Sequence, residues 1–204
     1  MKVTRRHLLE ASVLLGSMAL MGCKDKTAVQ VKTGANGLYV QPWFEDSFLD
    51  LKEELIAAQG EGKLLTLLFE QAGCPYCLDM HQENFNHPAI KTFMMKHFRV
   101  IQIDMKGSRE VTDFTGKVLT EAAFAKEWGV HFTPTLSFLP PDINKVVGQH
   151  IDNAGRRRGR EVEAFRLTGF WRAFHFESVL HFVHSGSYKN ENLQNFMSER
   201  KKQL

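Results

Sequence analysis

Cys74 and Cys77 stand three residues apart, shortly after an apolar run. The run, Lys63–Phe69, reads KLLTLLF and is typical of a strand that is buried on both faces. From Cys77 to Asn86 there is no glycine or proline, which favours a helix that begins at the cysteine pair. The sequence therefore predicts a buried strand, a short loop and a helix that starts with C-x-x-C.

The other apolar patterns predict that strands and helices alternate along the chain. The further strands are expected at Phe98–Ile103, Thr135–Leu139, Val146–Ile151 and Glu161–Leu167, the last two as a hairpin. The further helices are expected at Glu45–Gln59, Ala89–His97, Glu121–Trp128, Phe174–His184 and Asn192–Arg200. The order β-α-β-α-β-β-α predicts an α/β sandwich over residues 41–204, with a central mixed sheet flanked by helices.

The cysteine count and the charge exclude several classes of protein. Three cysteines in 204 residues are too few for a disulfide-dense scaffold or a zinc site with four cysteines. The formal net charge is +3, and residues 1–22 contribute +2 of it through three basic residues and one acidic residue. The remaining +1 gives no reason to expect a nucleic-acid partner.

Met80 and His81 lie one helical turn beyond Cys77, a spacing that invites a copper or zinc interpretation. One face of a helix supplies too few ligands for a closed metal site. We therefore interpret the two residues as a core methionine and a surface histidine, and we predict no metal ion and no cofactor.

The C-x-x-C pair has the residues that thiol–disulfide exchange requires. Exchange needs a thiolate, and a free cysteine with a pKa of about 8.5 is mostly protonated at neutral pH. A helix N-terminus offers unpaired N–H groups and partial positive charge, which favour the anion. Cys74 lies nearest that end, so we predict that it attacks the partner's disulfide and that Cys77 resolves the mixed disulfide. Pro75 fixes φ and stiffens the loop, and Tyr76 is expected to shape its surface.

Residues 1–22 have the pattern of an export signal and are not expected to belong to the fold. The basic start includes Thr4–Leu9, which resembles a twin-arginine motif, and the apolar stretch that follows ends at Cys23. This ending resembles the bacterial lipobox, in which the cysteine is lipidated. We predict a twin-arginine or lipoprotein signal at 1–22, a lipidated Cys23, a tether at 23–40 and a periplasmic location on the membrane. The alternatives are an ordinary cleaved signal or an uncleaved anchor, with Cys23 incidental.

A second motif, Thr133-Pro134, lies just before the predicted strand Thr135–Leu139. With both motifs placed, the chain resembles the thioredoxin superfamily, and Glu127–Thr135 is similar to the family's helix, Gly-Val, x-x-Thr-Pro-Thr passage. An X-Pro bond is trans by default. The resemblance implies instead a cis Pro134 that packs beside the cysteines, where Thr133 and Pro134 would pair with a substrate strand.

More narrowly, the chain resembles the SoxW-type periplasmic thioredoxins of sulfur-oxidising bacteria, over roughly Gln41–Phe196. The stretches that carry this likeness are Phe69–Cys77, Arg109–Phe114 and Gly169–Lys189. The resemblance implies a reductase that takes electrons from a membrane thiol transporter of the CcdA type. It would pass them to oxidised exported proteins, such as a carrier of the thiosulfate-oxidising system. No dimerisation segment is evident in the sequence, which favours a monomer.

One position departs from the family pattern. Thioredoxins usually place a buried Asp six residues before the first cysteine, as a proton acceptor for the second, and Leu68 stands there instead. Glu70 is the nearest carboxylate and is the candidate proton acceptor for Cys77. The alternative is a glutamate at the end of a strand that faces water.

Two other functions stay open at the level of sequence. The chain would be a disulfide oxidase or isomerase if its potential were oxidising, because Cys-Pro-Tyr-Cys also occurs in glutaredoxins and does not fix the potential. It would be a docking module for a membrane complex if the pair held copper or a static disulfide.

Overall fold

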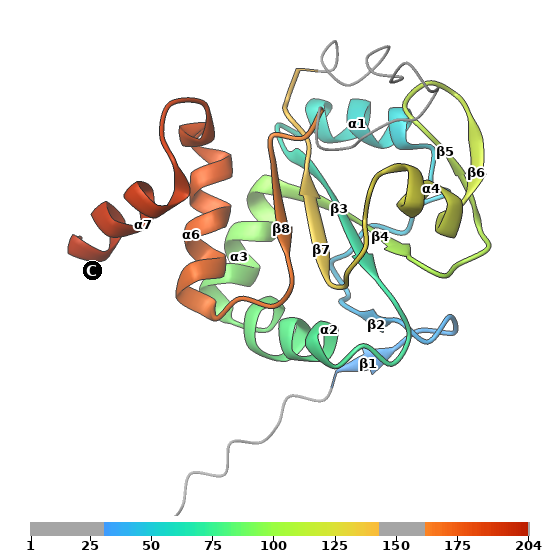
Figure 1. Ribbon diagram of the computed structural model, residues 1–204, viewed down its shortest axis with the longest axis horizontal. Helices are drawn as coiled ribbons and strands as arrows, with labels where there is room; N and C mark the ends of the chain where they lie inside the picture. The colour runs from blue at the N-terminus through green and yellow to red at the C-terminus, as the bar shows by residue number, and fades with distance from the viewer. Residues whose placement is uncertain (1–30, 143–161, 204) are drawn as a thin grey trace, which may run out of the picture.

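A four-stranded sheet in the order β4-β3-β7-β8 forms the centre of the computed structural model, which describes residues 31–142 and 162–203 (Figure 1). The strands are β3 (Leu64–Glu70), β4 (Phe98–Asp104), β7 (Thr135–Phe138) and β8 (Phe165–Thr168). β3 runs parallel to β4 and antiparallel to β7, and β8 runs antiparallel to β7. The sheet is therefore mixed, as the sequence predicts.

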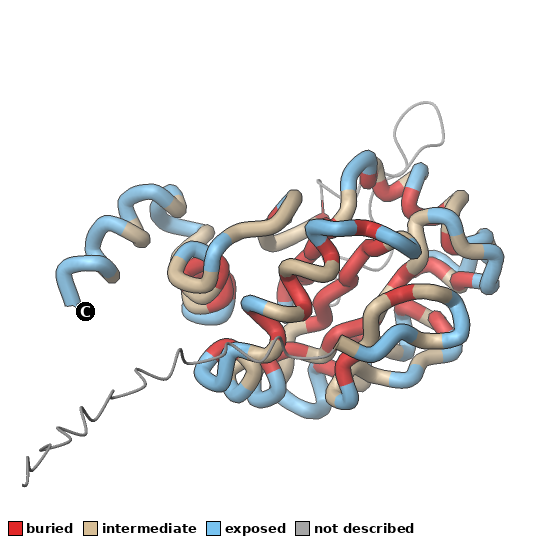
Figure 2. The backbone as a smooth tube through the Cα atoms, turned by 90° about the horizontal axis from the view of Figure 1, so that it is seen from below, coloured by how far each residue is buried: buried red, intermediate tan, exposed pale blue. Residues whose placement is uncertain are grey.

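Strand β3 is central because its side chains are apolar on both faces of the sheet. Leu65, Leu67 and Phe69 pack with α1 (Leu51–Gly60) and α4 (Glu121–Glu127). Leu68 faces the other way, toward the layer of α3 (Pro88–His97) and α6 (Ala173–His184). Figure 1 shows α3 and α6 on one side of the sheet and α4 on the other, and buried residues run through the middle in Figure 2.

Helix α1 begins six residues later than the predicted helix Glu45–Gln59. The Asp50 carboxylate accepts hydrogen bonds from the N–H groups of Lys52 and Glu53 and so caps the helix at its N-terminus. Phe48, which contributes to the apolar pattern, lies before this cap with its side chain in solvent. The prediction was wrong because apolar periodicity locates a helix without marking its first turn.

The chain between β3 and β4 is helical almost throughout. Short α2 (Pro75–Asp79) leads directly into a π-helical segment, η1 (Met80–Phe85), and α3 follows with Pro88 in its first turn. Cys74 takes the position that caps α2. The prediction of a helix that starts at the cysteine pair is confirmed.

Two small hairpins lie outside the central sheet. The first pairs β5 (Glu110–Thr112) with β6 (Val118–Thr120), joined through a turn in which Gly116 has φ +84°. The other hairpin pairs β1 (Lys32–Thr33) with β2 (Tyr39–Val40). The predicted tether, 23–40, overlaps this second hairpin. Its boundary is corrected here, because Leu38 is fully buried and belongs to the folded part.

The C-terminal part contacts α6 through Phe196, whose ring meets that of Phe182, and through Arg200, which pairs with Glu177. A 3-10 turn, η3 (Ser187–Lys189), connects α6 to α7 (Leu193–Lys202), whose first turn is capped by Asn192. The predicted signal, Cys23 and the strand Val146–Ile151 lie outside the described residues. Within 31–142 and 162–203, no helix has the length and apolar character needed to cross a membrane.

Three histidines meet where α3 packs against α6, and they predict a pH-dependent stability. The rings of His97 and His184 are 3.9 Å apart between centroids. Burial, with the nearby charge of His184, lowers the pKa of His97, and burial with the charge of Arg200 lowers the pKa of His181. A lowered pKa in the folded state means that the unfolded chain binds more protons. The free energy of unfolding is therefore undiminished at a pH above the histidine pKa of the unfolded chain, about 6.5, and it decreases as the pH falls below that value.

We expect the free energy of unfolding by urea to be smaller at pH 5.5 than at pH 7.5. The matched variant is His184→Gln, which removes the charge that opposes protonation of His97. The drop between the two pH values should be smaller in this variant than in the wild type. An equal drop in both proteins would assign the pH dependence to other groups.

Candidate active site

Cys74 is the N-cap residue of α2, and its sulfur takes the role that a Ser or Asp oxygen usually has. Cys74 Sγ accepts a hydrogen bond from the backbone N–H of Cys77 at 3.1 Å. The two cysteines form a disulfide, with their Cα atoms 5.2 Å apart. The structure therefore places the pair at the helix start, with Cys74 at the end that favours a negative charge.

A second donor reaches the same sulfur from the segment before β7. The hydroxyl of Thr133 donates to Cys74 Sγ at 3.3 Å. The peptide bond between Thr133 and Pro134 is cis, as the resemblance implies, and Pro134 is buried. The structure thus brings together two motifs that are 59 residues apart in the sequence.

The surface around the disulfide is apolar and aromatic, although the sulfurs themselves are covered. Cys74 is 3% exposed and Cys77 is fully buried, so the attacking position is the more accessible of the two. Pro75 is exposed, and Tyr76 is 61% exposed beside it. Phe132 is 69% exposed, just before the cis bond. These side chains offer an apolar rim to a partner that approaches the disulfide.

Glu70 is 1% exposed, so the interpretation of it as a water-facing glutamate is wrong. Side chains two apart on a strand point to the same face, and Glu70 therefore shares the face of Leu68. Leu68 occupies the position of the family's Asp and packs in the core. Glu70 extends the same face by two residues toward the loop that carries Cys74.

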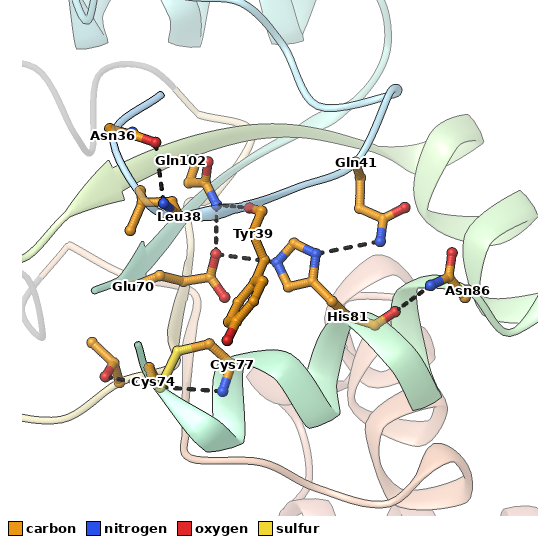
Figure 3. Close-up of polar contacts among 11 residues, drawn as sticks. Asn36, Leu38, Tyr39, Gln41, Glu70, Cys74, Cys77, His81, Asn86 and Gln102 are labelled. Carbon is orange, nitrogen blue, oxygen red and sulfur yellow. Dashed lines mark hydrogen bonds and ion pairs between the residues drawn. A yellow bond between two sulfur atoms is a disulfide. The ribbon is translucent and has the colours of Figure 1, made fainter. Parts of the chain in front are cut away.

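Two nitrogen atoms bind one oxygen of the Glu70 carboxylate. Oε2 lies 2.5 Å from Nε2 of Gln102 and 3.2 Å from Nε2 of His81. Oε1 is buried and has no hydrogen-bond partner among the described residues. In Figure 3 the carboxylate lies beside the His81 ring and above the disulfide, with Oε2 toward His81 and the other oxygen on the side of the cysteines.

His81 is fully buried, so the prediction of a surface histidine was wrong. Its ring contacts Tyr39, Phe44 and Phe85, with centroids 5.8, 5.6 and 5.0 Å away, and its Nδ1 lies 3.3 Å from the amide nitrogen of Gln41. The spacing contained a signal, because a residue four positions after a buried Cys77 lies on the same helical face. Its hydrogen-bond partners, Gln41 just after β2 and Glu70 on β3, have no such signal in the sequence.

Among residues 31–142 and 162–203, no three histidine, cysteine or acidic side chains gather in a way that would hold a metal ion. The site consists of a disulfide, a buried carboxylate and a buried imidazole. It has the groups for exchange between thiols and disulfides and for a proton transfer coupled to it.

Comparison with known proteins supports a thioredoxin-like fold. Residues 51–151 match the family profile described as a thioredoxin-like domain. A thioredoxin-fold protein from Helicobacter pylori is similar in structure, with 18% identity, 70% of this chain and 87% of that chain covered, and a TM-score of 0.53. At this identity the likeness concerns the fold.

Two further solved structures are similar over the same share of this chain. A thioredoxin from Thermus thermophilus has 22% identity, 90% of its own chain covered and a TM-score of 0.49. The C-terminal domain of DsbD from Neisseria meningitidis, in its oxidised form, has 16% identity, 97% covered and a TM-score of 0.41. No curated protein matches the sequence.

Proposed function

We propose that this chain is a thiol–disulfide oxidoreductase in which Cys74 attacks and Cys77 resolves, because residues 51–151 match the profile of a thioredoxin-like domain. The observation that carries the proposal is the different surroundings of the two sulfurs. Cys74 Sγ accepts hydrogen bonds from the Cys77 N–H and the Thr133 hydroxyl, and both would stabilise a thiolate. Cys77 is fully buried, on the side of Glu70.

The reaction runs in two displacements that begin from the reduced pair. The Cys74 thiolate attacks one sulfur of a substrate disulfide, an S–S bond forms between them, and the other substrate sulfur leaves as a thiolate that takes a proton from water. The Cys77 thiol then gives its proton to Glu70 and attacks Cys74 Sγ. The second substrate sulfur leaves, and the Cys74–Cys77 disulfide remains. Two electrons have passed from the pair to the substrate.

We further propose that the chain reduces disulfides of exported proteins from a position on the periplasmic side of a bacterial membrane. The support is in the sequence: the export signal pattern at 1–22, the lipobox-like ending at Cys23, and the SoxW-type resemblance. In this proposal, lipidated Cys23 tethers the domain and a CcdA-type transporter supplies the electrons. The substrates include oxidised carriers of the sulfur-oxidation system.

The test uses bacterial cells that produce the full chain. The wild type should sediment with membranes, and Cys23→Ser should move into the soluble periplasmic fraction. The detergent-solubilised wild type, once reduced, should convert one disulfide of a bridged peptide to two thiols per chain. A chain that stays on the membrane without Cys23 would contradict the lipid tether. A reduced chain that leaves the peptide oxidised at every pH would contradict the reductase.

A further inference from the structure

The hydrogen bonds around His81 fix which of its nitrogens carries the proton. The amide nitrogen of Gln41 can only donate, so Nδ1 of His81 accepts that bond. The neutral ring then carries its hydrogen on Nε2, and Nε2 donates to Glu70 Oε2. Gln41 therefore selects the tautomer that points an N–H group at the carboxylate.

Gln102 supplies the second donor to the same oxygen. Its Nε2 donates one hydrogen to the backbone oxygen of Tyr39 at 2.7 Å and the other to Glu70 Oε2 at 2.5 Å. A buried carboxylate needs such donors, because a charge taken out of water without partners is costly. Both donors go to Oε2, so Oε1 is the oxygen left open to a proton from elsewhere.

We propose that His81 is a positioning residue for the resolving step, which it serves by holding Glu70 so that Oε1 receives the proton of Cys77. This inference rests on the proposed thiol–disulfide exchange. In the step, the S–H bond of Cys77 breaks and its proton goes to Oε1. The sulfur of Cys77 forms a bond to Cys74 Sγ, and the substrate sulfur leaves with the electron pair of the bond to Cys74.

The surroundings of His81 suit a positioning role. Three aromatic rings enclose the imidazole, and both of its nitrogens are bound, so the ring has one orientation. It lies in η1, and π-helical turns occur frequently at functional sites. Its bond to Glu70 joins the helical segment that carries Cys77 to strand β3.

Few other titratable groups face the pair formed by Glu70 and His81. Tyr39 comes from β2 and Cys77 from α2. Asp104 lies beside Glu70 in the register of β3 and β4, but its carboxylate accepts from the N–H of Lys106. If substitution of His81 changes the pH dependence of the resolving step, we therefore attribute the change to Glu70 and Cys77.

The experiment follows the mixed disulfide between the full chain and a bridged peptide by rapid acid quench and mass spectrometry, from pH 6 to pH 9. His81→Phe keeps an aromatic ring and removes the donor. His81→Gln keeps a donor at similar reach. His175→Phe makes the same exchange at an exposed histidine of α6 and is the matched control.

We expect the mixed disulfide to decay about 10-fold more slowly in His81→Phe than in the wild type at pH 7. This factor is smaller than the roughly 10²- to 10⁴-fold rate increase of acid–base catalysis, because Glu70 itself remains in the variant. His81→Gln and His175→Phe should decay at nearly the wild-type rate. In a Glu70→Gln background, His81→Phe should add little, because both substitutions remove the same function. Gln41→Leu removes the bond that favours the Nε2–H tautomer of His81 and should slow the same step. This variant provides the test if His81→Phe fails to fold.

Equal decay in the wild type, His81→Phe and Gln41→Leu would overturn the inference. The inference would also be overturned if His81→Phe slowed decay of the mixed disulfide by the same factor in the Glu70→Gln background as in the wild type. The role of His81 would then be structural. Failure of the proposed function has a different signature. In that case the wild type itself forms no mixed disulfide with the peptide.

Discussion

Replacing Cys77 with serine should leave the chain covalently joined to its substrate. Cys74 still attacks the disulfide of a bridged peptide, because its two hydrogen-bond donors come from the Cys77 backbone and from Thr133. The serine hydroxyl cannot displace the substrate sulfur, so the mixed disulfide persists. Mass spectrometry under non-reducing conditions should show nearly all of the Cys77→Ser chain as the adduct and only a small, transient fraction of the wild type.

The same measurement on Cys74→Ser separates the roles of the two cysteines. This variant should form no adduct, because Cys77 is fully buried. A Cys23→Ser background removes the third thiol as a source of adducts. If Cys74→Ser traps the peptide and Cys77→Ser does not, the assignment of attacking and resolving cysteines is reversed.

Glu70→Gln is expected to slow the resolving step by roughly 10²-fold at neutral pH, the lower end of what a general base contributes. The glutamine keeps the shape of the side chain but cannot take a proton at Oε1. Water must then remove the proton of Cys77. For an ordinary thiol with a pKa of about 8.5, the rate should climb about tenfold per pH unit below that value. The wild-type rate should vary less steeply over the same range.

Glu121→Gln is the matched control for this prediction. Glu121 is also 1% exposed, but its carboxylate binds Arg109 and the N–H of Asp104 instead of His81 and Gln102. This substitution should lower stability without changing the pH profile of resolution. If Glu121→Gln and Glu70→Gln alter that profile alike, the effect comes from loosening of the fold and Glu70 is not the proton acceptor.

The sequence predicts β3, β4, β7 and the cysteine pair well because their signals are local. The apolar run before Cys74 is typical of a buried strand, and β3 is one residue away from the predicted bounds at each end. The start of α1 was wrong because Asp50, a single capping side chain, decides it. The end of the tether was wrong because burial of Leu38 depends on contacts with distant segments.

The carboxylate site shows the same limit more sharply. Its position at the end of a strand makes Glu70 a candidate proton acceptor. Only the fold determines whether its carboxylate faces water or is buried in the core. His81, Gln41 and Gln102 come from three separate segments, and no pattern in the chain connects them. A polar residue in a helix can lie at the surface, or it can be buried with its hydrogen-bonding groups paired. The partners that satisfy His81 lie 40 residues before it and 11 residues before it.

The reduction potential of the Cys74–Cys77 pair, measured by equilibrating the full chain with redox buffers, distinguishes a reductase from an oxidase and from a docking module. We expect a reducing value, near the roughly −270 mV of thioredoxin. A value near the roughly −120 mV of DsbA would contradict the reductase and favour disulfide formation. A pair that never equilibrates with the buffers would contradict exchange altogether and favour a docking module with a static disulfide.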